Sequence, residues 1–186
     1  PDVLFTVNGV EVPAIAYDDA TGLYTTVFTL TGERLYNVSM TRYAEEYIAI
    51  GILRNITGTY TDLQNKIDEA VVAGVDLVLP YDFAYTAEID GDKFPDGVVI
   101  DSPITIDGNG FTISGDNTYR IFDVTNDATL TLSNVVIENG NATNGAGVYV
   151  ESGASLIADN VVFSNNVANS KGGAVYSEGI VSINHS

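Results

Sequence analysis

The 186-residue sequence contains no cysteine and no tryptophan, one methionine, one histidine and only seven basic residues. The absence of cysteine excludes disulfide bonds, thiolate metal ligands and a cysteine nucleophile. No apolar run is long enough to span a bilayer and no signal peptide is evident, so no membrane insertion is expected in this segment. The single histidine, His185, stands at the end of the sequence, so no histidine-based catalytic triad is predicted.

The scarcity of basic residues leaves a strongly negative chain, with 25 acidic residues against 7 basic ones and a net charge of -18. Such a surface repels the phosphates of nucleic acids and the anionic head groups of membranes, so neither is an expected partner. The charge is consistent with keeping a β protein soluble and the edges of its sheets from pairing. A specific role in binding cations is the alternative interpretation.

The sequence does contain a repeat of about 26 residues in its second half. Residues 128–137 return as 154–163, and the glycine-containing segment 145–151 returns as 172–178. A fixed period of 20 to 50 residues predicts stacked units, each of which buries its apolar face against the next. The units here are short alternating strands separated by Gly, Asn and Asp. They predict an all-β fold: a right-handed, single-stranded parallel β-helix of about four coils.

Residues that recur at the repeat spacing predict which side chains stack. Ile104, Leu130 and Leu156 step by 26 residues, and Val181 continues the series, so these side chains are expected one above another in the interior. Two asparagine pairs have the same spacing. We expect Asn134 over Asn160, and Asn139 over Asn165, with their amides bonding along the stack. Val162 and Phe163 are both assigned to the interior.

One helix is predicted, over residues 61–73. A capping box fits Thr61–Gln64, and Leu63, Ile67 and Val71 share one face. A helix placed just before a stack of strands is suited to cover its open end, near Leu77 and Leu79. A helix that binds a partner is the alternative.

Residues 1–55 predict a separate, small antiparallel unit, followed by the capping helix and β-helix over residues 56–186. Asn8-Gly9 between two apolar runs indicates a two-residue hairpin. Five strands fall short of a complete immunoglobulin sandwich, so the unit is predicted as a truncated or minimal immunoglobulin-like domain. The predicted strands are 4–7, 10–12, 23–30, 35–41 and 47–53.

Residues 85–95 are predicted as an acidic outward loop, in which Asp90 and Asp92, followed by Asp96, are the candidate metal ligands. Neither this segment nor Asp107-Gly-Asn109 completes a calcium loop with its terminal glutamate. Turn chemistry explains both, because Asp, Asn and Gly are the usual turn residues. The sequence therefore predicts no metal and no cofactor, with the three aspartates as the candidate if a metal is bound.

Catalysis needs reactive groups that this part of the sequence scarcely supplies. Pectate-lyase-like β-helix enzymes require clustered carboxylates for Ca²⁺ and a basic residue that takes a proton from the sugar. Beyond residue 55 the basic residues are Lys66, Lys93, Arg120 and Lys171. Arg120 lies two positions before inward-facing Phe122, so a structural partner such as a backbone carbonyl is expected for it. No catalytic residue is predicted.

Two kinds of surface site remain. Four acceptor triplets for N-glycosylation begin at Asn37, Asn55, Asn141 and Asn184. By strand alternation, Tyr149 and Tyr176 face outward on adjacent coils, about 5 Å apart. Stacked rings could hold a sugar or a protein side chain. The alternative is a tyrosine ladder that only stabilises the strand face.

Two motifs carry a resemblance to known families. Phe163-Ser-Asn-Asn166 and Gly172-Gly-Ala-Val175 resemble the FxxN and GGA[ILV] repeats of polymorphic outer-membrane proteins. Four longer stretches are similar to the adhesin-like surface proteins of methanogenic archaea: 58–64, 104–113, 120–122 and 139–143. The resemblance implies a large, secreted, repetitive cell-surface protein in which β-helix stretches join immunoglobulin-like modules.

The resemblance also implies a function. We expect a non-catalytic part of a secreted surface adhesin, whose partner is the surface of another cell, a protein or a glycan. One alternative is a polysaccharide-active, pectate-lyase-like enzyme whose catalytic coils lie elsewhere, and another is a passive stalk. Because the sequence begins at Pro1 rather than Met and ends inside a repeat, we expect a fragment of a longer protein.

Overall fold

A computed structural model describes residues 57–186 throughout and, within residues 1–56, only the backbone of six strands. The chain divides into two compact units, Pro1–Ile56 and Thr57–Ser186. This boundary lies one residue from the division that the sequence predicts.

The first unit contains antiparallel strands. Its four-stranded sheet has the order β2-β1-β5-β6, and β3 and β4 form a separate hairpin. Val7 pairs with Val10, which confirms the hairpin at Asn8-Gly9. The sequence missed β3, because three residues give too little alternation to detect. The remainder of the predicted immunoglobulin-like unit lies outside the described residues. The strands are β1 (Val3–Val7), β2 (Val10–Val12), β3 (Ala16–Asp18), β4 (Leu23–Thr25), β5 (Val38–Arg42) and β6 (Glu45–Ile48).

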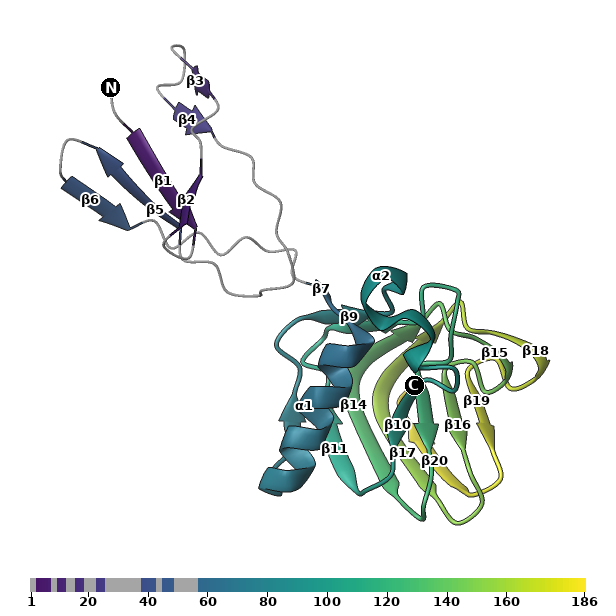
Figure 1. Cartoon of the computed structure of the whole chain (residues 1–186). Coiled ribbons are helices and arrows are strands. Elements are labelled where there is room, and N and C mark those ends of the chain that lie inside the picture. Colours follow the sequence, from purple (N-terminus) through teal and green to yellow (C-terminus); the bar gives the residue numbers. More distant parts are fainter. Residues whose placement is uncertain are drawn as a thin grey trace. The chain divides into compact units, whose positions relative to one another are not determined.

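The second unit is built mostly of strands in parallel sheets (Figure 1). One sheet has the order β10-β13-β16-β19, and its strands are β10 (Val98–Ile100), β13 (Phe122–Val124), β16 (Val148–Val150) and β19 (Val175–Ser177). A two-stranded sheet pairs β15 (Asn141–Asn144) with β18 (Val167–Lys171).

The largest sheet has the order β20-β17-β14-β12-β9-β7, with β11 paired to both β14 and β8. Its strands are β7 (Thr57–Gly58), β8 (Leu77–Val78), β9 (Asp82–Ala84), β11 (Ile104–Asp107), β12 (Thr112–Ser114), β14 (Thr129–Glu138), β17 (Ser155–Ser164) and β20 (Ile180–Asn184). The chain runs through the sheets in turn, and each pass pairs in parallel with the pass before it.

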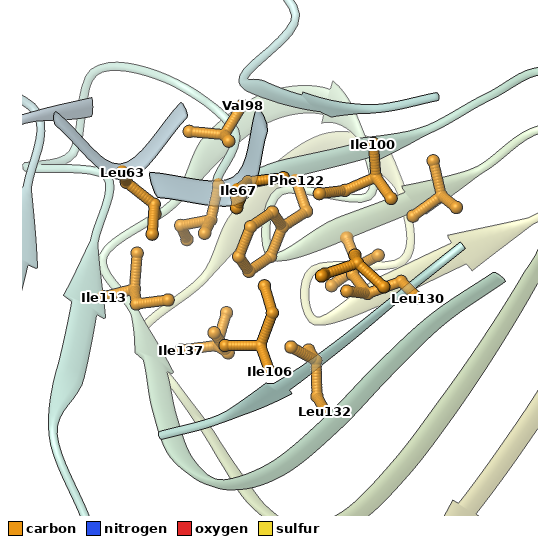
Figure 2. Close-up of a cluster of buried hydrophobic side chains, with 14 of the residues drawn as sticks. Leu63, Ile67, Val98, Ile100, Ile106, Ile113, Phe122, Leu130, Leu132 and Ile137 are labelled. Carbon is orange, nitrogen blue, oxygen red and sulfur yellow. The ribbon is translucent and has the colours of Figure 1, made fainter. Parts of the chain in front are cut away.

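The interior follows the 26-residue spacing. Ile104 pairs with Leu130, Leu130 with Leu156 and Leu156 with Val181, as predicted. The first three side chains are buried, whereas Val181 is 36% exposed on the last strand of the sheet. Figure 2 shows part of this core, in which Phe122 and Leu130 lie among residues from several strands.

The interior assignment of Val162 is wrong. Its side chain is 54% exposed, and fully buried Val161 takes the inward position. Asn160 adopts the left-handed conformation with φ 55°, as Asn134 does one pass earlier with φ 51°. A left-handed residue turns the strand at a corner and resets its alternation, so Val161 pairs with Val135 on the inner side.

The predicted helix is present as α1 (Tyr60–Ala73), and left-handed Gly74 ends it as expected. The predicted capping box is wrong by two residues. The N-cap is Thr59, whose hydroxyl accepts from the Asp62 amide, while the Asp62 carboxylate accepts from the Thr59 amide at 2.9 Å. Gln64 has another role: its amide group donates to the Val99 carbonyl at 3.0 Å and accepts from the Val99 amide at 2.9 Å.

Helix α1 packs its apolar face onto the strands, as predicted. Leu63 and Ile67 are buried in the same core as Leu79, and Figure 2 shows both helix residues pointing into the cluster. Val71 is only half-buried. Tyr60, which the sequence did not assign to the core, is fully buried.

Candidate functional site

The middle residues of β10, β13, β16 and β19 form an outer ladder, which comprises Val99, Asp123, Tyr149 and Tyr176. These residues pair in register from strand to strand. Their neighbours in β10, β13 and β16 are buried on the opposite side, for example Val98 and Ile100 around Val99. The period of two in a strand therefore directs all four side chains to the outer face.

The two tyrosine rings stack on each other. Their centroids are 5.3 Å apart and their planes differ by 28°. This distance is close to the spacing of paired strands, so the rings lie face to face along the direction in which the strands stack. The structure thus places both rings on adjacent strands of the outer face, as the alternation predicts.

Cations lie against both rings. The Arg120 guanidinium carbon is 4.7 Å from the Tyr149 ring centroid, and Lys171 Nζ is 5.8 Å from that of Tyr176. Cation–π attraction holds positive charge at such distances. Because neighbouring groups occupy the ring faces, a partner would chiefly meet ring edges and the charged groups beside them.

Arg120 is held by the backbone, as the sequence predicted. Its Nε donates to the Gly145 carbonyl at 3.1 Å, and its two terminal nitrogens donate to the carbonyls of Asp96 at 3.1 Å and Asn144 at 3.2 Å. The planar fork of donors suits such a set of acceptors. The guanidinium thereby ties together segments from successive passes, and its position over Tyr149 is fixed.

The sequence analysis missed Asp123. Its Oδ1 lies 3.3 Å from a terminal nitrogen of Arg120, and the residue is 9% exposed. Burial raises the pKa of this carboxyl to about 6; the charges of Glu151 and Asp96 raise it further, and Arg120 lowers it. A signal was present, because Asp123 stands 26 residues before Tyr149 between two inward-facing residues.

Acidic groups flank the tyrosine hydroxyls. The Tyr176 hydroxyl donates to Glu178 Oε1 at 3.4 Å. Burial raises the pKa of Tyr149, and a hydrogen bond with Glu178 and the nearby charges of Glu178, Tyr176 and Glu151 add to the effect. The outer ladder therefore combines aromatic rings with fixed donors and acceptors of both charges, which suits recognition of a polar ligand.

The candidate metal ligands serve a different purpose, and the prediction of an outward loop is wrong. The segment forms α2 (Ala87–Asp90) and a 3₁₀ helix (Gly91–Lys93), with Tyr85 and Phe94 buried against Tyr60. Figure 1 shows α2 beside one end of α1.

The Asp90 side chain is what anchors this segment. It is fully buried and accepts from the amides of Tyr60 at 3.1 Å, Thr61 at 2.9 Å and Thr86 at 2.8 Å, and from the Thr61 hydroxyl at 2.8 Å. A carboxylate at a helix N-terminus satisfies amides that have no partner within the helix. Burial, and secondarily the charge of Asp90, raise the pKa of Tyr60.

Asp92 and Asp96 do not join Asp90 in a cluster. Asp92 accepts from the Tyr119 hydroxyl at 3.3 Å, and the Asp96 carbonyl binds Arg120. Within residues 57–186, no three His, Cys, Asp or Glu side chains are grouped so that they could hold a metal ion.

The asparagine ladder is confirmed at one of its two predicted positions. Asn160 Nδ2 donates to Asn134 Oδ1 at 2.9 Å, and Asn134 Nδ2 donates to Asp107 Oδ1 at 3.1 Å. These two bonds lower the pKa of Asp107 together with a larger contribution from the Asn109 amide. Asn139 does not extend such a ladder to Asn165 and donates to Glu138 at 3.1 Å.

The glycosylation triplets differ in accessibility. Asn184 is exposed in β20. Asn141 is half-buried in β15, and its Nδ2 donates to the Asn117 carbonyl at 3.0 Å. Asn37 and Asn55 lie outside the described residues. None of the described helices is both long and apolar enough to cross a membrane.

Comparison with known families identifies one segment. Residues 160–178 match the Chlamydia polymorphic membrane protein (Chlamydia_PMP) repeat. No curated protein and no solved structure matches the chain. The chain therefore contains a repeat of the polymorphic membrane protein type, which occurs in surface and outer-membrane proteins.

The matched residues make contacts that explain the motif. Asn166, the last residue of FxxN, donates to the Ile137 carbonyl and accepts from the Gly140 amide, both at 2.8 Å. Gly172, the first residue of GGA, has φ 62°. A side chain is strained in that conformation, and glycine is not. The motif thus joins one pass to the preceding pass.

Proposed function

We propose that residues 57–186 form a right-handed parallel β-helix of about four coils, closed at one end by α1, within a secreted cell-surface adhesin. Four features support this: the parallel pairing at about 26 residues, the three sheets that the chain visits in turn, the covering helix and the matched repeat. The similarity to archaeal adhesin-like proteins supports the same function, as does the resemblance of residues 1–55 to an immunoglobulin-like module.

We propose further that the outer ladder is the contact face, and that the partner is the surface of another cell, a protein or a glycan. The stacked pair Tyr149 and Tyr176 is the observation that carries this proposal. Of four basic side chains in residues 57–186, two lie against these rings, although the same residues hold 18 acidic ones. Several copies on one cell would convert weak contacts into stable attachment.

This function requires no catalysis. Arg120 is the only arginine in residues 57–186, and three carbonyls and Asp123 engage its guanidinium. A lyase needs a base that is free to approach the sugar. The polysaccharide-active enzyme is therefore the weaker proposal, and we propose that this chain does not cleave acidic glycans such as polygalacturonate.

The test compares two double variants of the 186-residue chain in binding to whole cells and to a glycan array. Tyr149→Ala with Tyr176→Ala removes the rings and should reduce binding at least tenfold while the circular dichroism spectrum is retained. Tyr149→Phe with Tyr176→Phe keeps the stacked rings and serves as the matched control for loss of the hydroxyls. Unchanged binding in the alanine variant would exclude the outer ladder. Absence of binding by the unmodified chain would favour the passive stalk.

A further inference from the structure

A groove of about 300 Å³ lies between the C-terminal turn of α1 and the outer side of β11 and β14. Figure 1 shows α1 beside these strands. The groove is separate from the outer ladder, which belongs to the sheet of β10, β13, β16 and β19. The residues that define its chemistry are Val71, Val75, Asp76, Thr105, Thr129 and Thr131.

Three threonine hydroxyls form the floor of the groove. Thr105 pairs directly with Thr131, and Thr129 lies two residues before Thr131 in the same strand. Their neighbours Ile104, Ile106 and the leucines of β14 are buried, so all three threonines point outward. The strand geometry spaces them about 5 Å apart across the strands and about 7 Å along β14.

These hydroxyls are available to a ligand. All three threonines are half-buried, and none of their hydroxyls makes a hydrogen bond within residues 57–186. Each hydroxyl offers one donor and two acceptor positions. Three such groups on a rigid sheet are pre-ordered, so a ligand that binds them does not have to immobilise flexible side chains.

The wall of the groove adds an apolar surface and a carboxylate. Val71 and Val75 come from the end of α1 and the residue after Gly74, and Val75 is 58% exposed. Asp76 is exposed and makes no hydrogen bond or ion pair within the described residues of this unit. A carboxylate accepts hydrogen bonds from hydroxyl or ammonium groups and repels anions.

We infer that this groove binds one pyranose unit of a neutral or amino-substituted glycan. The sugar hydroxyls would bond to the three threonines and to Asp76, and the C–H face of the ring would lie on Val71 and Val75. The volume is at the lower end of ligand sites in proteins, which fits a single sugar ring. Asp76 and the net charge of -18 disfavour uronic acids. This inference deepens the proposed adhesive function by adding a glycan site apart from the tyrosines.

The experiment is a titration of the 186-residue ¹⁵N-labelled chain, followed by amide chemical shifts. The probes are methyl α-glucopyranoside, its 2-amino-2-deoxy analogue and methyl glucuronoside. A ligand of this size should bind with a dissociation constant on the order of millimolar. We expect saturable shifts at the amides of Val75, Asp76, Thr105 and Thr131, with the amino sugar bound at least as tightly as the neutral sugar and the glucuronoside at least threefold more weakly.

Isosteric variants provide the decisive comparison. Thr105→Val with Thr131→Val removes two hydroxyls and keeps β-branched side chains in the strands, and it should weaken binding at least tenfold. Thr112→Val, in β12 and away from the groove, is the matched control and should bind normally. Binding that survives the double valine change, or no saturable shift up to about one hundred times the expected constant, overturns the inference. The variant that lacks Tyr149 and Tyr176 should still bind the sugar here, so failure of the outer ladder is distinguishable from failure of the groove.

Discussion

Protonation of Asp123 should make the second unit more stable as the pH falls toward 4. The carboxyl is 9% exposed, and burial raises its pKa from 3.8 to about 6. The folded state therefore takes up this proton at a higher pH than the unfolded state does. A group of this kind destabilises the fold when it is ionised, and the penalty is released as the pH falls through about 6 and then through 3.8.

The magnitude follows from the two pKa values. Each pKa unit corresponds to about 1.36 kcal/mol, so the shift is equivalent to about 3 kcal/mol at pH 7.5. At pH 4.5 the folded carboxyl is already protonated and the unfolded one is not, which leaves about 1 kcal/mol. Asp123→Asn keeps the shape of the side chain and removes its charge. The variant should exceed the native chain in free energy of unfolding by about these amounts at the two pH values.

The assay is urea unfolding followed by circular dichroism, with hydrogen exchange of the β13 and β16 amides to assign the change to this unit. Asp116→Asn is the matched control. It removes the same charge at an exposed turn residue with φ 48°, a conformation that asparagine also tolerates, and should leave the pH dependence unchanged. An Asp123→Asn variant that is less stable than the native chain at pH 7.5, or a difference that does not vary with pH, would refute the reasoning.

Two further substitutions test contacts that join distant segments. Asp90→Ala leaves the buried amide of Tyr60 and its neighbouring donors without an acceptor, and urea unfolding should show a loss of about 1–3 kcal/mol, with faster hydrogen exchange in the first turn of α1 as the specific sign. Asn166→Ala removes the bonds to Ile137 and Gly140 and should also cost about 1–3 kcal/mol, whereas Asn166→Asp should recover only the bond to the Gly140 amide. Native-like exchange in either alanine variant would contradict the role assigned to that side chain.

The spacing of the repeat was sufficient to predict which strands pair. Leu130 and Leu156 lie 26 residues apart and are direct partners, because a stacked parallel fold converts sequence period into spatial register. The same rule would have found Asp123, which precedes Tyr149 by the same interval. Its burial was not evident, because it depends on Arg120 and on the rings above it rather than on its own strand.

Long-range contacts account for the main errors. Thr59 and Thr61 both begin a plausible capping box, and local sequence does not distinguish them. The Thr61 hydroxyl donates to Asp90, which lies 29 residues away, so Thr59 is left to cap the helix. Asp90 itself has the sequence context of a surface turn. Its burial follows only from the arrival of the N-terminus of α1 beside α2.

The contacts of Arg120 and Asp123 make the outer ladder sensitive to pH in its charge as well as in its stability. Three backbone carbonyls fix the guanidinium over Tyr149, and these bonds do not depend on the protonation of Asp123. When Asp123 is ionised, it offsets the positive charge at 3.3 Å. When it is protonated, below a pH of about 6, the guanidinium is left as the dominant charge beside the ring. The proposed contact face therefore becomes less negative in acid, at the same pH at which its supporting strand becomes more stable.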